Sequence, residues 1–99
     1  MFVTDLLKGK RVLITGGGSG LGRSAAKRIM ELGAEPVICG RREQVLEETA
    51  AALRDETGGA ISWKQLDIRD PEAVDATVAE IWQEGPLDAL INNAAGNFL

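Results

Sequence analysis

The sequence lacks histidine and tyrosine altogether, and its single cysteine is Cys39. Without histidine, the chain has no Ser-His-Asp or Cys-His catalytic pair and no Cys/His zinc site. One cysteine cannot form an internal disulfide, and a chain without disulfides is typical of a reducing compartment. We therefore expect a cytoplasmic protein without a bound metal.

The sequence also lacks a long apolar run and an excess of positive charge. No stretch approaches the roughly 18 apolar residues that a membrane span requires, and the N-terminal residues lack the basic-then-apolar order of a signal peptide. The chain has 11 basic and 15 acidic residues and a net charge of −4, which does not favour binding to nucleic-acid phosphates. We expect neither a membrane nor a nucleic acid as a partner.

What the sequence does contain is a globular composition, with 44% hydrophobic and 26% charged residues in a 99-residue chain, which fits one domain. Short runs of aliphatic residues alternate with longer amphipathic stretches. The order βαβαβαβ is typical of an α/β fold with right-handed crossovers. The strands are expected over residues 11–15, 36–39, 60–66 and 87–91, and the helices over 21–32, 42–56 and from Asp70-Pro71 to Gly85-Pro86.

This alternation predicts half of a Rossmann-type, doubly wound parallel sheet with strand order 3-2-1-4. The first two helices should cover one face and the third helix the other. Gly33 should end the first helix in a left-handed conformation. The buried stripe is expected to hold Leu21, Ala25, Ile29 and Leu32 in the first helix, and Val74, Val78, Ile81 and Trp82 in the third.

A glycine-rich segment, Thr15-Gly16-Gly17-Gly18-Ser19-Gly20-Leu21-Gly22, joins the first strand to the first helix. Glycine allows a tight turn and a close approach of backbone to a phosphate, and the N-terminus of the following helix offers free N–H groups. The segment therefore predicts a phosphate-binding loop, although a glycine-rich turn can also be purely structural. The spacing matches neither the P-loop pattern nor the plain G-x-G-x-x-G pattern.

Three motifs in order resemble those of the short-chain dehydrogenase/reductase family. They are T-G-x-x-x-G-x-G after the first strand, Asp67-Ile68 after the third, and Asn92-Asn93-Ala94-Ala95-Gly96 after the fourth, where the family has N-N-A-G and this chain one extra alanine. The resemblance implies that these segments contact a nicotinamide cofactor, Asp67 and Ile68 at the adenine ring. The implied contacts are Gly16, Gly18, Ser19, Gly20, Leu21, Gly22, Asp67, Ile68, Asn93, Ala94, Ala95 and Gly96.

The end of the second strand predicts which nicotinamide cofactor binds. Enzymes that prefer NAD usually carry a carboxylate there for the ribose 2′-hydroxyl, whereas this chain has Gly40 followed by Arg41 and Arg42. A guanidinium can hold a 2′-phosphate through several donors. We therefore predict NADP(H), with Arg41 as the principal phosphate ligand and Arg42 as the second. The alternative is that both arginines are only solvated.

Further resemblance concerns the substrate. The run from Asn93 to Phe98 is similar to a loop of the 2,4-dienoyl-CoA reductase branch, which reduces unsaturated fatty acyl-CoA with NADPH and in which Asn97 and Phe98 would face the substrate. Members of the family transfer hydride by means of a tyrosine and a lysine four residues later. This chain has no tyrosine.

We therefore expect residues 1–99 to be the NADP-binding part of a single Rossmann domain, ending before the catalytic half and inactive alone. The parent enzyme would transfer hydride between NADP(H) and a small carbonyl or enoyl substrate and would form a homo-oligomer. The alternative is a stand-alone, non-catalytic nucleotide-binding module.

Overall fold

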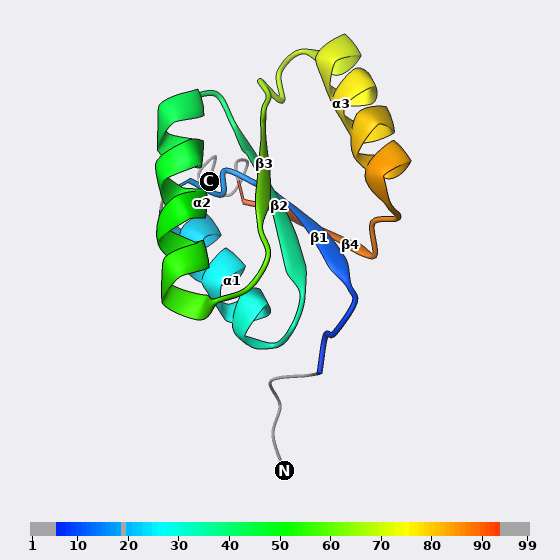
Figure 1. The fold of residues 1–99 in the computed structure, drawn as a ribbon. Helices are drawn as coiled ribbons and strands as arrows, with labels where there is room; N and C mark the ends of the chain where they lie inside the picture. The colour runs from blue at the N-terminus through cyan, green and yellow to red at the C-terminus, as the bar shows by residue number, and fades with distance from the viewer. Residues whose placement is uncertain (1–5, 19, 94–99) are drawn as a thin grey trace.

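The computed structural model describes residues 6–18 and 20–93 and forms a parallel sheet in the order β3-β2-β1-β4, with helices on both faces (Figure 1). The predicted α/β class and strand order are confirmed. The elements are β1 (Arg11–Thr15), α1 (Gly20–Glu31), β2 (Glu35–Gly40), α2 (Glu43–Thr57), β3 (Ser62–Gln65), α3 (Pro71–Glu84) and β4 (Ala89–Asn92).

The two central strands, β1 and β2, are apolar on both faces because helices cover both sides of the sheet. In β1, the four residues from Val12 to Thr15 are all buried. Strand β1 pairs in parallel with β2 on one side and with β4 on the other, so that Ile14 lies opposite both Ile38 and Ile91. All four strands therefore end at the same edge of the sheet.

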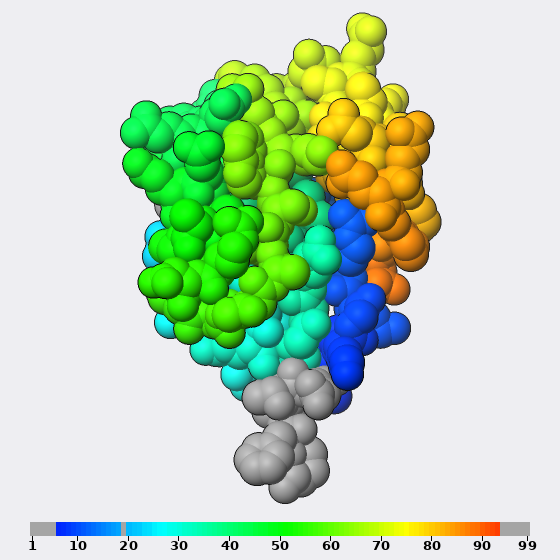
Figure 2. All heavy atoms as spheres, viewed as in Figure 1, coloured from blue at the N-terminus to red at the C-terminus, as the bar shows by residue number. Residues whose placement is uncertain are grey.

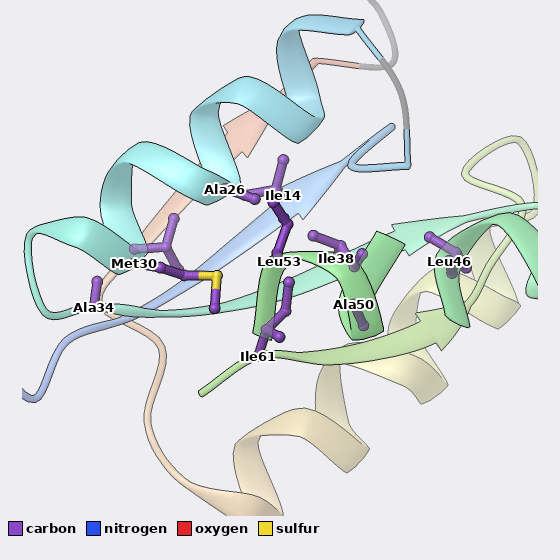
Figure 3. Close-up of a cluster of buried hydrophobic side chains, with 10 residues drawn as sticks. Ile14, Ala26, Met30, Ala34, Ile38, Leu46, Ala50, Leu53 and Ile61 are labelled. Carbon is purple, nitrogen blue, oxygen red and sulfur yellow. The ribbon is translucent and has the colours of Figure 1, made fainter. Parts of the chain in front are cut away.

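Helices α1 and α2 cover one face of the sheet, and α3 covers the other (Figure 1), as the sequence predicts. We call the buried side chains of the first face the α1–α2 cluster; Figure 3 shows most of them. The α3 cluster on the opposite face is smaller. Figure 2 shows α2 and α3 on either side of the β3 edge. The α3 cluster contains Leu13, Val37, Cys39, Leu66 and Ile81.

Local signals in the sequence explain where two of the helices begin or end. The Asp70 carboxylate accepts a hydrogen bond from the Ala73 backbone N–H at 3.2 Å, and Pro71 occupies the first helical position of α3. Gly33 follows α1 with a φ of 98°, a conformation that side chains disfavour. Both features agree with the sequence-based prediction.

Two residues predicted to lie on buried faces are exposed. Leu21 is 79% exposed because α1 packs through Gly22, Ala26 and Met30, which bring the helix close to the sheet. Trp82 is 52% exposed, since α3 faces the sheet through the adjacent Ile81 and through Val74 and Val78, and successive helical residues point about 100° apart. The predicted bounds of β3 and β4 each start two residues too early, since the strands begin at Ser62 and Ala89. The predicted end of β3 is one residue too late and that of β4 one residue too early, since the strands end at Gln65 and Asn92.

No helix among residues 6–18 and 20–93 has the length and apolar character needed to cross a membrane.

Candidate functional site

The carboxyl edge of the sheet gathers the glycine loop, of which the structure describes residues 16–18, and the segments that follow β2 and β4. The Asn93 side-chain amide donates a hydrogen bond to the Gly16 carbonyl at 3.2 Å. The Thr15 hydroxyl lies 2.8 Å from Oδ1 of Asn92, the last residue of β4. The predicted meeting of the glycine loop with Asn93, at the switch between β1 and β4, is therefore confirmed.

Two further contacts hold the glycine loop against β2 and α2. The Gly16 backbone N–H donates to the Cys39 carbonyl at 2.9 Å. The hydroxyl of Thr49, a residue only 2% exposed, donates to the Gly18 carbonyl at 3.0 Å. The loop is thus tied to β2, α2 and the end of β4, so its backbone has a fixed position.

Three glycines of the segment, Gly17, Gly18 and Gly22, leave no room for a side chain, whereas Gly20 faces open space. A Cβ atom on Gly17 would lie 2.5 Å from Cγ2 of Ile38, and one on Gly18 would lie 2.9 Å from Cγ1 of Val45. A Cβ atom on Gly22, in the first turn of α1, would collide with the Gly16 carbonyl. These glycines allow α1 to begin directly against the loop, where the first N–H groups of the helix can face an anion.

A hollow of about 430 Å³ lies beside the loop, within the range typical of ligand pockets. Backbone from the loop forms one side of it, and the β2–α2 connection forms the other. The lining combines small backbone-exposing residues, two aliphatic side chains and two cations. The lining residues are Gly16, Gly18, Gly40, Arg41, Arg42, Val45 and Leu46.

Arg41 and Arg42 are exposed at this hollow, and the charge of Arg41 also helps to lower the pKa of the Asp67 carboxyl. In the part of the chain that the structure describes, neither arginine forms an ion pair, whereas Arg11, Arg23 and Arg69 do. Arg42 precedes α2 and makes no side-chain capping bond. Glu43 in the first turn of α2 supplies one negative charge, and two positive charges near a helix N-terminus favour the binding of a further anion. This arrangement fits a phosphate.

Asp67 and Ile68 follow β3, as predicted, but they do not line the hollow. The Arg69 guanidinium holds the Asp67 carboxylate through Nη2 and Oδ2 at 2.8 Å and through Nε and Oδ1 at 3.0 Å. These hydrogen bonds, joined by one from the Arg69 backbone N–H, lower the pKa of Asp67 to about 2. The carboxylate is therefore ionised and held in one orientation at neutral pH.

The remaining predicted site residues lie at the start of α1 or outside the described part of the chain. Gly20 begins α1 with a φ of 54°, and the exposed Leu21 follows it. Ser19, Ala94, Ala95 and Gly96, as well as Asn97 and Phe98, lie outside the described residues.

Sequence reasoning missed two polar side chains that hold the site together. Thr49 lies on the buried stripe of its helix, and a hydroxyl at a buried helical position is itself a sign of a specific hydrogen bond. Gln65 donates from Nε2 to the Arg41 carbonyl at 3.1 Å. No pattern in the sequence indicates that contact, because it joins residues on two different strand ends.

A family profile described as short chain dehydrogenase matches residues 10–98. The chain therefore belongs to the short-chain dehydrogenase family. It is 44% identical over 96 residues to a Caenorhabditis elegans protein named probable 2,4-dienoyl-CoA reductase 3, and the match covers 94% of this chain and 31% of that protein.

Solved structures of the family superpose closely on this fold. Citronellol catabolism dehydrogenase from Pseudomonas aeruginosa PAO1 is 42% identical with a TM-score of 0.86, covering 91% of this chain and 38% of its own. L-sorbose reductase from Gluconobacter frateurii, complexed with NADPH and L-sorbose, is 34% identical with a TM-score of 0.82, covering 88% and 34%. The chain thus spans about a third of the length of these relatives.

Proposed function

We propose that this chain is the cofactor-binding part of an oxidoreductase that uses NADP(H). The observation that carries the proposal is the pair of exposed arginines, Arg41 and Arg42, at the hollow beside the glycine loop, neither of which forms an ion pair within the described part of the chain. A carboxylate at this position would accept a bond from a ribose hydroxyl and repel a 2′-phosphate, whereas a guanidinium favours the phosphate. The related L-sorbose reductase, whose structure is a complex with NADPH, supports the same choice.

The described residues would divide the binding among them. The glycine loop and the first turn of α1 would hold the pyrophosphate, and the hollow bounded by Val45 and Gly40 would hold the adenosine. Arg41 would hold the 2′-phosphate, with Arg42 beside it. Asn93 would keep the loop in place through its bond to the Gly16 carbonyl. The nicotinamide cofactor, when bound, supplies or accepts the hydride.

The substrate proposed for the parent enzyme is a small carbonyl or enoyl compound, with unsaturated acyl-CoA favoured by the reductase named above. We propose that the parent enzyme is a homo-oligomer, and that residues 1–99, which contain no tyrosine, are inactive alone. The free cysteine, Cys39, suits a reducing compartment, for which we propose the cytoplasm. The relatives named above are dehydrogenases and reductases, so they give no support to a non-catalytic module.

The cofactor assignment is tested by Arg41→Ala in the full-length protein that contains this chain. Loss of the charge-assisted contact should weaken NADPH binding by about 1.5–3 kcal/mol and leave NADH binding nearly unchanged. Isothermal titration calorimetry with both cofactors measures the two affinities. Arg28→Ala, at the far end of α1, serves as a matched control that should change neither. Equal affinities of the wild-type protein for the two cofactors would refute the assignment.

A further inference from the structure

The backbone that presents Arg41 is fixed on both sides. Before it, the Gly40 carbonyl accepts a hydrogen bond from the Leu66 backbone N–H at 2.7 Å. After it, the Arg42 carbonyl accepts one from the Leu46 backbone N–H at 3.1 Å. These bonds continue the β2–β3 ladder on one side and begin α2 on the other. Arg41 lies between the strand and the helix, outside both regular hydrogen-bond patterns.

A side chain supplies the bond at this gap. Nε2 of Gln65 donates to the Arg41 carbonyl at 3.1 Å. Gln65 is the last residue of β3 and pairs in register with Gly40, the last residue of β2. Its amide therefore reaches one residue beyond the end of the strand pairing. Three successive carbonyls are held in this way, and only the bond at Arg41 depends on a side chain.

We propose that Gln65 is a positioning residue for selectivity between NADP(H) and NAD(H). By holding the Arg41 carbonyl, it sets the direction in which the Arg41 side chain leaves the backbone toward the hollow. A cation that is already oriented loses less conformational freedom when it binds a phosphate. This inference rests on the proposed function, since it assigns Arg41 to the 2′-phosphate.

The test separates the 2′-phosphate from the rest of the cofactor. Adenosine 2′,5′-bisphosphate and AMP differ by that phosphate, so the ratio of their affinities reports the phosphate contact. In the full-length protein, Gln65→Met keeps the length of the side chain and removes the donor. Calorimetry should show a fall in this ratio of roughly 3- to 10-fold, the range expected for one hydrogen bond, with AMP affinity unchanged.

Two control variants distinguish positioning of Arg41 from a general loss of structure. Gln83→Met makes the same substitution on the exposed surface of α3 and should leave both affinities unchanged. Thr49→Val removes the hydroxyl that holds the Gly18 carbonyl. It should therefore weaken the binding of adenosine 2′,5′-bisphosphate and of AMP by the same factor and leave the ratio of their affinities unchanged. Gln65→Glu provides a second variant at the proposed position, and its carboxylate should lower the ratio further than Gln65→Met does.

A double-mutant cycle shows whether Gln65 acts through Arg41. In an Arg41→Ala background, Gln65→Met should have no further effect on the ratio. An unchanged ratio in Gln65→Met and Gln65→Glu, with a reduced ratio in Arg41→Ala, would overturn this inference and leave the proposed function standing. Additive effects of the two substitutions would also overturn it. No change of the ratio in Arg41→Ala would refute the proposed function itself.

Discussion

Asp67, which is half-buried, and the exposed Arg69 hold each other through paired hydrogen bonds directly after β3. Their paired hydrogen bonds leave the carboxylate ionised far below neutral pH. Asp67 lies outside the lining of the hollow, and the charge of Arg41 also helps to lower its pKa.

The carboxyl of Asp67 should titrate with a pKa of about 2, against an ordinary value of 3.8. Because this pKa is lowered on folding, the ion pair stabilises the fold above pH 4 and the contribution is lost as the pH falls toward 2. Carbon-detected NMR titration measures the pKa directly. Arg69→Ala should return it toward 3.8, whereas the control Arg28→Ala should leave it unchanged. A pKa near 3.8 in the unsubstituted protein would contradict the observed pairing.

At the residue scale, the sequence predicts backbone-determined features better than side-chain contacts. That Asn93 lies beside the glycine loop follows from topology, because parallel strands β1 and β4 end side by side, although the bond from its side chain to Gly16 was not predicted. The positions of Arg41 and Arg42 follow from the end of β2. The bonds made by Thr49 and Gln65 could not be predicted, because either side chain can serve many local roles and three-dimensional placement selects one.

Among the helices, α1 depends most on close contact with the glycine loop. Its buried face consists of Gly22, Ala26 and Met30, and the smallest of these residues lies where the helix meets the loop. Small side chains let a helix axis approach backbone closely, and any added atom must displace the helix or the loop.

Gly22→Ala should therefore destabilise the protein by about 3 kcal/mol, because the new Cβ atom would meet the Gly16 carbonyl. Gly58→Ala is the matched control: its φ is 72° but nothing lies within 4 Å of the added atom, so only backbone strain of about 1 kcal/mol is expected. Urea unfolding of the full-length protein measures the loss in free energy of unfolding for each variant. Equal losses for Gly22→Ala and Gly58→Ala would show that the contact of α1 with the loop relaxes without an energetic cost.

At the scale of elements, periodicity predicted the number, order and type of helices and strands, but it placed two exposed residues, Leu21 and Trp82, on buried faces. Leu21 is the most apolar residue of the first turn of α1, so hydrophobicity alone favours its burial. The close approach made by Gly22 overrides that preference. In α3, Ile81 is fully buried and the half-buried Val74 and Val78 pack against the same cluster, whereas the larger Trp82 is left half exposed.

For the molecule as a whole, β4 is the most exposed part of the described sheet. Leu90 lies opposite Leu13 of the α3 cluster, yet it is 61% exposed, and Trp82 of α3 is also exposed. Strand β4 pairs with β1 on one side, and its outer edge presents backbone groups that can pair with another chain.

We expect residues 1–99, expressed alone, to self-associate at high concentration through this edge. Burying Leu90 would contribute roughly 1.5–3 kcal/mol per molecule. Leu90→Lys should reduce association, because a charged side chain opposes edge pairing. Leu6→Lys, at a residue that is 68% exposed outside the sheet, should not. Sedimentation velocity distinguishes these outcomes, and a monomeric wild-type chain at high concentration would favour a stand-alone module.

The buried clusters on the two faces of the sheet need different lengths of the chain to be complete, and this difference decides which cluster can form first during synthesis. Every buried member of the α1–α2 cluster lies between Val12 and Ile61, whereas the α3 cluster also needs Ile81. Translation proceeds from the N-terminus at about 5–20 residues per second. The first side can therefore close on the nascent chain while α3 and β4 are still being made. The glycine loop gains its bond from Asn93 only after the rest of this sheet has emerged from the ribosome.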